Sequence, residues 1–256
     1  MHILAVDVGN TTTEFGLYSD EELVTSYRFI TKQERTMDEA AFFVRDFLEL
    51  HSLTFSDIGD AILSSVVPNI NQTLINMFRK YMDVDPMIVG PGIKTGINVA
   101  TANPREVGAD RIVDALAAYE IYGGPVIVVN YGTATRYDYV DADGQFKYAV
   151  TSPGIKISAD ALWTKAAKLP EIEIAKPDTI LVNNTITSMQ AGLVYGCIGQ
   201  TEYIVKQMRK ETGTEAKTVV AGGYAPIIMP HTEVLDIYDP LLTMKGLKLL
   251  YDKNRH

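Results

Sequence analysis

The first residues able to do chemistry stand where a short apolar segment ends. Residues 3–8 are apolar except for Asp7, and Gly9, Asn10 and Thr11 follow before a second strand-like segment begins. Glycine lets a backbone approach a ligand closely, and successive N–H groups at such a turn can bind an anion. Asp7 would then face bound phosphates and hold Mg²⁺ directly or through water. The same residues also suit an ordinary hairpin, so this turn alone leaves both interpretations open.

A second copy of the pattern stands near the middle of the chain. Residues 126–129 are apolar, Asn130 takes the place of Asp7, and Gly132 and Thr133 precede the next strand-like segment. Chance could produce so short a match, but a duplicated α/β half explains it better. Two opposed hairpins could then grip a triphosphate between two domains. The residues expected to contact the nucleotide there are Asp7, Val8, Gly9, Asn10, Thr11, Thr12, Thr133, Ala134 and Thr135.

A third glycine turn follows a predicted buried strand at residues 218–221. Gly222 and Gly223 come directly after that strand, and their lack of side chains permits flat contact with a base or ribose. A strand followed by two glycines is common at turns of every kind, so this feature matters only as the third of a series. In chain order the series reads phosphate, phosphate and nucleoside.

Composition and charge argue against several other classes of protein. The chain has 256 residues, of which 46% are apolar, enough for one large domain or two small ones. Its net charge is −9 and no run of Lys or Arg forms a patch, which argues against binding to nucleic acid. Cys197 is the one cysteine, so no disulfide can form within the chain. We expect a soluble cytoplasmic protein, because no segment approaches the ~18 apolar residues of a membrane span or resembles a signal peptide.

Two other motifs do not fit a known site. Residues 90–96 contain Lys94 and Thr95 after a glycine-rich stretch, but Ile93 stands where the Walker phosphate loop requires glycine. The four histidines are scattered along the chain without the spacing of metal ligands.

The elements that must position these residues alternate between strand and helix periodicity, which predicts an α/β protein. The strongest linker signal lies in residues 90–107, so the predicted domains are 1–105 and 106–256. Strands are predicted at 3–8, 15–18, 23–30, 61–67, 87–89, 125–129, 137–140, 145–150 and 218–221. Helices are predicted at 37–50, 69–81, 109–122, 157–168, 187–210 and 240–251.

Longer motifs occur almost from end to end. They are Asp7–Thr11, Ser64–Pro68, Gly90–Gly96, Asn103–Arg111, Gly132–Thr135, Pro153–Ser158, Ala166–Pro170, Asn184-Thr185 and Met189-Gln190. In these segments the chain resembles the type III pantothenate kinases, bacterial enzymes that phosphorylate pantothenate in coenzyme A synthesis. This family is similar to acetate and sugar kinases, Hsp70 and actin. The resemblance therefore implies two duplicated ribonuclease-H-like domains with a cleft between them, the actin-like ATPase fold, together with ATP, Mg²⁺ and a homodimer.

The resemblance assigns the acceptor site to the segment that opens the predicted helix 109–122. Asp110 is the implied general base, and Gly108, Ala109 and Arg111 complete the implied pantothenate-binding segment. A carboxylate that accepts a hydroxyl proton contributes about 10²–10⁴-fold in rate, and a guanidinium can orient a carboxylate as a bidentate fork. The structural alternative is that Asp110 is a first-turn acid complementing the helix dipole, with Arg111 on the solvated face.

Two threonines complete the implied substrate site. Thr185 is implied to contact the substrate across the dimer interface, although it would also serve as the N-cap of the predicted helix 187–210. Thr101 occupies the position of a family tyrosine that packs on pantothenate.

The chain departs from the family pattern around this pocket. Asn130 replaces an aspartate that holds a monovalent cation, and a neutral amide binds a hard cation less strongly, so little dependence on K⁺ or NH4⁺ is expected. Asp7 and Asn130 remain the candidate metal ligands. Arg136 stands where the family has threonine, and its guanidinium could substitute for the cation. Tyr148 with Ala149 replaces a Gly-Gly pair, and Val182 replaces a glycine.

Three functions follow from the resemblance and the departures. The first is an ATP-dependent pantothenate kinase in which Asp110 abstracts the acceptor proton. The second is a catalytically impaired paralog that acts as a regulatory or accessory binding protein. The third is a kinase for another small hydroxylated acid, with Thr101 and Tyr148 reshaping the acceptor pocket.

Overall fold

The computed structural model describes residues 2–255 of the chain and divides into two compact units. The first unit comprises residues 2–96, 105–117 and 243–255, and the second comprises residues 97–104 and 118–242. Each of the predicted domains, 1–105 and 106–256, is one continuous stretch of the sequence. In the compact units, by contrast, the start of one helix and all but the first residue of the C-terminal helix belong with the N-terminal sheet.

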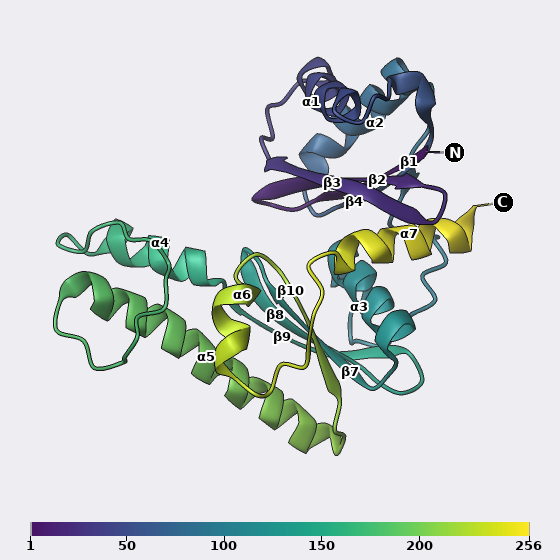
Figure 1. The fold of residues 1–256 in the computed structure, drawn as a ribbon. Helices are drawn as coiled ribbons and strands as arrows, with labels where there is room; N and C mark the ends of the chain where they lie inside the picture. Colours follow the sequence, from purple (N-terminus) through teal and green to yellow (C-terminus); the bar gives the residue numbers. More distant parts are fainter. Residues whose placement is uncertain (1, 256) are drawn as a thin grey trace. The chain divides into compact units, whose positions relative to one another are not determined.

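The first unit contains a mixed sheet of order β3-β2-β1-β4-β5 (Figure 1). Its strands are β1 (His2–Val8), β2 (Thr12–Ser19), β3 (Glu22–Ile30), β4 (Ile58–Ser65) and β5 (Met87–Ile88). The first three form an antiparallel meander, and β4 and β5 continue it in parallel with β1. Helices α1 (Met37–Glu49) and α2 (Pro68–Met82) lie together on one face of this sheet, and the short helix η1 (Phe55–Asp57) precedes β4.

Alternation along β1 decides which side chains meet the core and which face the site. Leu4, Val6 and Val8 belong to the apolar cluster under α1 and α2. Asp7 therefore lies on the opposite face, because successive side chains of a strand point to opposite sides. On that face α7 (Leu242–Asn254) packs closely: Met244 contacts the position of Gly16, and the Tyr251 hydroxyl donates to Asp60 at 2.8 Å.

The second unit repeats the topology of the first. Its sheet has the order β11-β10-β7-β8-β9-β6. The strands are β6 (Asn98–Val99), β7 (Val126–Tyr131), β8 (Ala134–Val140), β9 (Gln145–Pro153), β10 (Lys217–Ala221) and β11 (Ile237–Tyr238). Strands β9-β8-β7 form an antiparallel meander, and β10 and β11 run parallel to β7, as β4 and β5 do to β1. The predicted duplication is confirmed, with β6 as an added strand.

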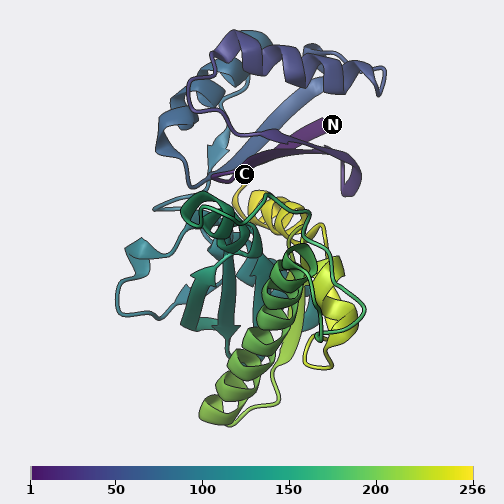
Figure 2. The same cartoon turned by 90° about the vertical axis from the view of Figure 1, so that its left-hand side faces the viewer.

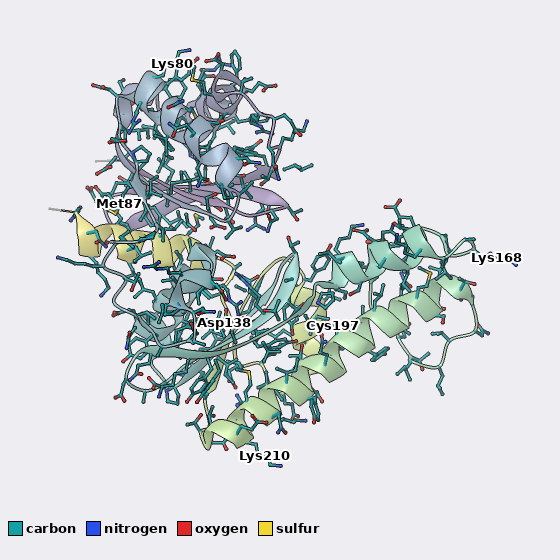
Figure 3. All side chains as sticks on the ribbon, turned by 180° about the vertical axis from the view of Figure 1, so that it is seen from behind. Lys80, Met87, Asp138, Lys168, Cys197 and Lys210 are labelled. Atoms are coloured by element: carbon teal, nitrogen blue, oxygen red, sulfur yellow. The ribbon has the colours of Figure 1, made fainter. Side chains whose placement is uncertain are left out.

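Long helices cover the second sheet. Helix α5 (Thr185–Thr212) runs along it, with α4 (Ile155–Lys165) and the short α6 (Ala225–Ile228) beside it (Figure 2). The buried thiol of Cys197 on α5 belongs to the same apolar cluster as Val129 and Tyr131 of the sheet (Figure 3). Helix α3 (Ala109–Tyr122) precedes β7. The remaining elements are two single-turn helices, η2 (Pro104–Glu106) and η3 (Met229–His231).

Most predicted elements are confirmed, and helix 109–122 has the predicted bounds. The two-residue strands β6 and β11 were not predicted, because a segment so short has no periodicity to detect. Strand β8 begins three residues earlier than predicted, since Thr135 and Arg136 are polar in sequence yet pair with β7. None of the helices within residues 2–255 combines the length and the apolar character that crossing a bilayer requires.

Candidate active site

The turn that the sequence predicts to bind phosphate, named the first phosphate turn, connects β1 to β2 through Gly9–Thr11. The Gly9 N–H donates to the Thr12 carbonyl at 3.0 Å, which closes the turn. Asn10, Thr11 and Thr12 are exposed, so their side chains can reach a ligand. The side chain of Val8 is buried in the core, so only its backbone is available to a nucleotide.

Asp7 stands at the carboxyl end of β1, beside a second polar side chain that the sequence analysis did not assign to the site. In the β1–β4 register Asp7 pairs with Ser64, so the two side chains share one face of the sheet. Ser64 is 0% exposed, and its hydroxyl has no hydrogen-bond partner among residues 2–255. Since a buried polar group without a partner costs free energy, Ser64 marks a place where a ligand, ion or water would be stabilised. The sequence signal was a serine at the end of the apolar run Ala61–Leu63.

Asp110, the candidate base, lies at the same end of the first sheet. The Val66 N–H donates to the Val8 carbonyl at 3.0 Å, so the chain just beyond β4 stays beside the end of β1. A Cβ atom on Gly108 would lie 3.5 Å from the Val66 side chain and 2.6 Å from the Asp110 Oδ1 atom. The structure therefore brings Asp7 and Asp110 to one edge of one sheet, a common location for sites in α/β proteins.

Steric contact explains the glycine before the candidate base. At 2.6 Å from Oδ1, any side chain on Gly108 would displace the Asp110 carboxylate. That carboxylate also accepts the Arg111 N–H at 2.9 Å, which fixes its direction in the first turn of α3. Asp110 lies in the first turn of α3, where it complements the helix dipole, and also at the end of the sheet that carries Asp7, so its position agrees with either interpretation. Ala109 and Arg111 are half-buried, and Arg111 is not on a fully solvated face.

The second phosphate turn is one residue shorter than the first. Tyr131 pairs with Thr135 across it, whereas Val8 pairs with Thr13 across the first turn. The buried Thr135, 1% exposed, is therefore the structural counterpart of Thr13. Thr133 is exposed at the tip and Ala134 is half-buried behind it.

Two glycines allow other segments to pack against this second turn. Gly222 has φ +95°, and a Cβ atom there would lie 2.5 Å from the Tyr131 carbonyl oxygen. A Cβ atom on Gly154 would lie 2.4 Å from the carbonyl oxygens of Gly132 and Thr133, so the chain between β9 and α4 passes equally close. Gly222 thus packs against the start of this turn within the second unit. The role of Gly154 was not predicted, because nothing in the local sequence reveals its long-range neighbour.

Asn130 and Arg136 face each other across the second turn. They are directly paired in the β7–β8 register, so their side chains lie on the same face of the sheet. Ala221, at the end of β10, pairs with Asn130 on the other side, so Gly222 and Gly223 follow directly beyond Asn130. Asn130, Arg136 and the glycine pair Gly222-Gly223 therefore collect at the carboxyl ends of β7 and β10.

Among the remaining candidate substrate residues, Thr101 carries a distinctive hydroxyl. Its Oγ1 atom is buried and has no hydrogen-bond partner within the described part of the chain. As at Ser64, such a hydroxyl is stabilised only when a ligand or water supplies the missing bond. Tyr148 is 56% exposed and packs against Tyr139, with ring centroids 5.9 Å apart. Val182 is half-buried in the segment before α5.

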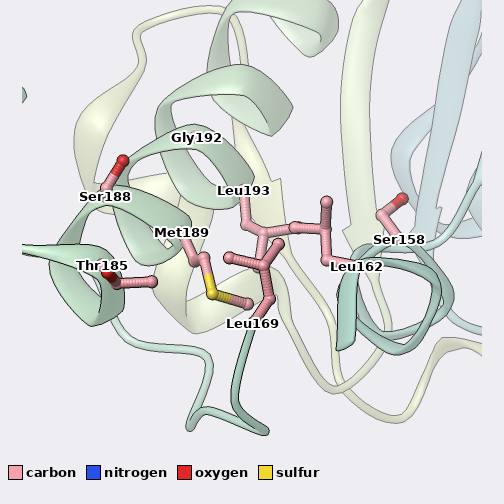
Figure 4. A pocket seen from close by; sticks show the side chains of 8 residues that line it. All are labelled: Ser158, Leu162, Leu169, Thr185, Ser188, Met189, Gly192 and Leu193. Carbon is pink, nitrogen blue, oxygen red and sulfur yellow. The ribbon is translucent and has the colours of Figure 1, made fainter. Parts of the chain in front are cut away.

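Thr185 lines a pocket between α4 and α5. The N-cap of α5 is Asn184, whose side chain accepts the Thr187 N–H at 3.0 Å, so the alternative of Thr185 as the cap is wrong. Thr185 is exposed, and it borders a hollow of about 540 Å³ (Figure 4). The hollow is lined by Ser158, Leu162, Leu169, Thr185, Ser188, Met189, Gly192 and Leu193.

Side chains that could hold a metal ion do not cluster in the described part of the chain. Residues 2–255 contain no group of three His, Cys, Asp or Glu side chains arranged to hold an ion. An ion held by one carboxylate, with substrate oxygens and water as its other ligands, is the arrangement that Mg²⁺ favours in phosphate-transfer sites. Asp7 is suited to that role by its carboxylate and its place beside Ser64.

The repeated meander, with two parallel strands added to each copy, defines the class of the protein. It has the actin-like ATPase and sugar kinase fold. A conserved protein from Campylobacter jejuni, assigned to the Baf family of transcriptional activators, aligns over 98% of both chains with a TM-score of 0.61 and 18% identity. An activator of 2-hydroxyisocaproyl-CoA dehydratase from Clostridium difficile, solved with bound ADPNP, aligns over 99% of this chain and 95% of its own, with a TM-score of 0.56 and 12% identity. Both likenesses concern the fold.

Sequence similarity identifies the family. The sequence profile of the type III pantothenate kinases matches residues 3–207. A type III pantothenate kinase from Agathobacter rectalis is 56% identical over 252 residues, which cover 98% of this chain and 97% of the relative. The chain belongs to the type III pantothenate kinase family.

Proposed function

We propose that the protein phosphorylates pantothenate with ATP, giving 4'-phosphopantothenate in the first step of coenzyme A synthesis. The high identity to a type III pantothenate kinase along the whole chain supports this activity. The observation that carries it is the gathering of Asp7, Ser64 and Asp110 at one end of the first sheet. A kinase needs a metal ligand and a base near one another, because phosphoryl transfer depends mostly on positioning and charge neutralisation.

The two turns and the glycine pair would hold the nucleotide. In this proposal the backbone of Gly9–Thr12 and the segment Thr133–Thr135 bind phosphate oxygens, and Gly222 with Gly223 lies against the nucleoside. Backbone N–H groups suit this task in a chain of net charge −9, which repels ATP at long range.

Asp110 and Arg111 would act on the acceptor. Pantothenate carries a primary hydroxyl and a carboxylate, and the Arg111 guanidinium can bind the carboxylate as a fork. The hydroxyl oxygen forms a bond to the γ-phosphorus, the bond from that phosphorus to the bridging oxygen of ADP breaks, and the hydroxyl proton passes to Asp110. The Arg111 N–H supports this step, because its bond to Asp110 Oδ1 holds the carboxylate in one direction.

Mg²⁺ would neutralise phosphate charge when bound, with Asp7 as its ligand from this chain. The second candidate ligand, Asn130, supplies a neutral oxygen, so a monovalent cation would bind weakly there. Arg136 supports this interpretation, since it is paired with Asn130 and brings a permanent positive charge to the same face of the sheet.

A homodimer would complete the substrate site through Thr185. The exposed position of Thr185 beside the hollow between α4 and α5 is compatible with contact from a second copy of the chain. Thr101, with its buried hydroxyl, would contribute a further hydrogen bond to pantothenate.

A coupled assay of ADP release tests the proposal. The purified protein is assayed with Mg·ATP, with and without pantothenate, in K⁺ and in Na⁺ buffers, beside the variant Asp110→Asn. We expect pantothenate-dependent ADP release of similar rate in both buffers, and a loss of at least ~10² in kcat for Asp110→Asn because the base is removed. ADP release only with other hydroxy acids, or ATP binding without turnover, would reject the activity. Unchanged kcat in Asp110→Asn would remove Asp110 from the mechanism.

A further inference from the structure

Thr31, just beyond β3, makes three hydrogen bonds at the first phosphate turn. Its N–H donates to the Thr11 carbonyl at 3.0 Å, and its hydroxyl donates to the Gly9 carbonyl at 2.8 Å. The same hydroxyl lies 2.8 Å from the hydroxyl of Thr13. One residue, about twenty positions further along the sequence, therefore binds two carbonyls of the turn, that of Gly9 through its side chain and that of Thr11 through its backbone.

The number of protons decides the direction of the third bond. A hydroxyl has one proton, and that of Thr31 is used toward the Gly9 carbonyl. The bond between the two hydroxyls must then be donated by Thr13, which is 0% exposed. A chain of hydrogen bonds consequently runs from Thr13 through Thr31 to Gly9, and it is stable only while Thr31 carries a hydroxyl.

These bonds orient the groups that would face the phosphates. In a trans peptide the C=O of one residue and the N–H of the next share a plane and point in opposite directions. Since Thr31 holds the carbonyls of Gly9 and Thr11, the N–H groups of Asn10 and Thr12 point away from Thr31. These two peptide planes are thereby set before a ligand arrives, and preorganised N–H donors bind an anion better than mobile ones.

Thr31 is itself held by a rigid segment. The Arg35 guanidinium packs against the stacked rings of Phe29 and Phe43, at 4.5 and 4.3 Å from their centroids, and donates to the Ile30 carbonyl at 3.2 Å. Directly after it, Thr36 caps α1 in a capping box with Glu39. The connection from β3 to α1 is therefore fixed on both sides of Thr31, so its contacts with the turn are not those of a loose loop.

We propose that Thr31 is a positioning residue for the nucleotide phosphates. It acts through the backbone of Gly9 and Thr11 and does not itself contact the ligand. The identity of that ligand as ATP rests on the proposed function. Losing the hydroxyl frees one peptide plane and leaves the Gly9 carbonyl and the buried Thr13 hydroxyl without this partner, so nucleotide affinity falls by about tenfold.

The test compares Thr31→Val, which keeps the shape and loses the hydroxyl, with Thr31→Ser, which keeps the hydroxyl. Thr25→Val is the matched control, because Thr25 is also a half-buried threonine of the β3 segment but pairs with Leu17, far along the strand from the turn. For each variant, Mg·ADP is titrated by calorimetry, and KM for ATP, KM for pantothenate and kcat are measured. Urea unfolding of each variant reports its stability separately.

We expect Thr31→Val to raise both the Kd for Mg·ADP and the KM for ATP about tenfold, with KM for pantothenate within about twofold of the parent protein. Thr31→Ser should restore nucleotide affinity to within about twofold, and Thr25→Val should leave it unchanged. Unchanged affinity in Thr31→Val, a failure of Thr31→Ser to restore it, or an equal loss for pantothenate would overturn the proposal. Should Thr31→Val not fold, Thr31→Ala against Thr31→Ser makes the same comparison. The ADP titration needs no turnover, so it tests Thr31 even if the parent protein does not phosphorylate pantothenate.

Discussion

Substituting Gly222 with alanine should damage the second phosphate turn more than its small size suggests. The Gly222 backbone has φ +95°, a conformation that L side chains rarely adopt. A Cβ atom there would lie 2.5, 2.6 and 2.7 Å from the carbonyl oxygen, carbonyl carbon and nitrogen of Tyr131. These are backbone atoms at the buried end of β7, so they cannot move aside as a flexible side chain would.

The expected cost has two parts. A left-handed backbone costs a residue with a Cβ atom roughly 1–2 kcal/mol, and overpacking a well-packed site costs roughly 1–3 kcal/mol. Together they predict that Gly222→Ala lowers the free energy of unfolding by about 2–5 kcal/mol, a large part of the roughly 5–15 kcal/mol of a typical domain.

Gly223→Ala provides the matched control. The two glycines are neighbours, but a Cβ atom on Gly223 would meet nothing within 4 Å. Urea unfolding, followed by fluorescence and circular dichroism, gives the midpoint and the slope for both variants. We expect the free energy of unfolding of Gly223→Ala to stay within about 1 kcal/mol of the parent value. Equal stability of the two variants would refute the close approach of Gly222 to Tyr131.

Two further predictions concern a buried hydroxyl and two buried phenols. Ser64→Ala should leave the free energy of unfolding unchanged or raise it by up to about 1 kcal/mol, because the Ser64 hydroxyl has no partner among the described residues. We expect kcat/KM to fall in the same variant. A loss of stability in urea together with full activity would contradict this prediction. Burial raises the pKa of Tyr137 to about 12 and also raises the pKa of Tyr131, and both hydroxyls bond to Thr201. The pKa values of both tyrosines in the folded state lie above the ordinary value near 10. Their contribution to the free energy of unfolding is therefore intact below pH 10. It is lost as the pH rises from 10 toward 12, by about 1.4 kcal/mol per pH unit for each tyrosine. The urea midpoint of unfolding, measured between pH 8 and 11.5, should fall less steeply with pH in Tyr137→Phe than in the parent protein. If the two proteins give parallel curves of midpoint against pH, Tyr137 does not contribute.

Local sequence determined much of the fold. Helix 109–122 was predicted with its observed bounds because apolar residues recur at a helical period along it. The strands on either side of Asp7 and Asn130 were recognised because apolar segments end in turn-forming residues. Those two features sufficed to predict the duplication, and the order of the strands in the two sheets confirms it.

Tertiary structure decided the details of the candidate site. The length of the second turn depends on the pairing of Tyr131 with Thr135, and register is a property of two strands that neither strand encodes alone. In the same way, the bond from Thr31 to Gly9 and the approach of Gly222 to Tyr131 join residues that are distant in sequence. Periodicity reports which side of an element faces the core, but hydrogen bonds and close contacts form between elements. They are therefore determined only when the chain folds and the elements are brought together.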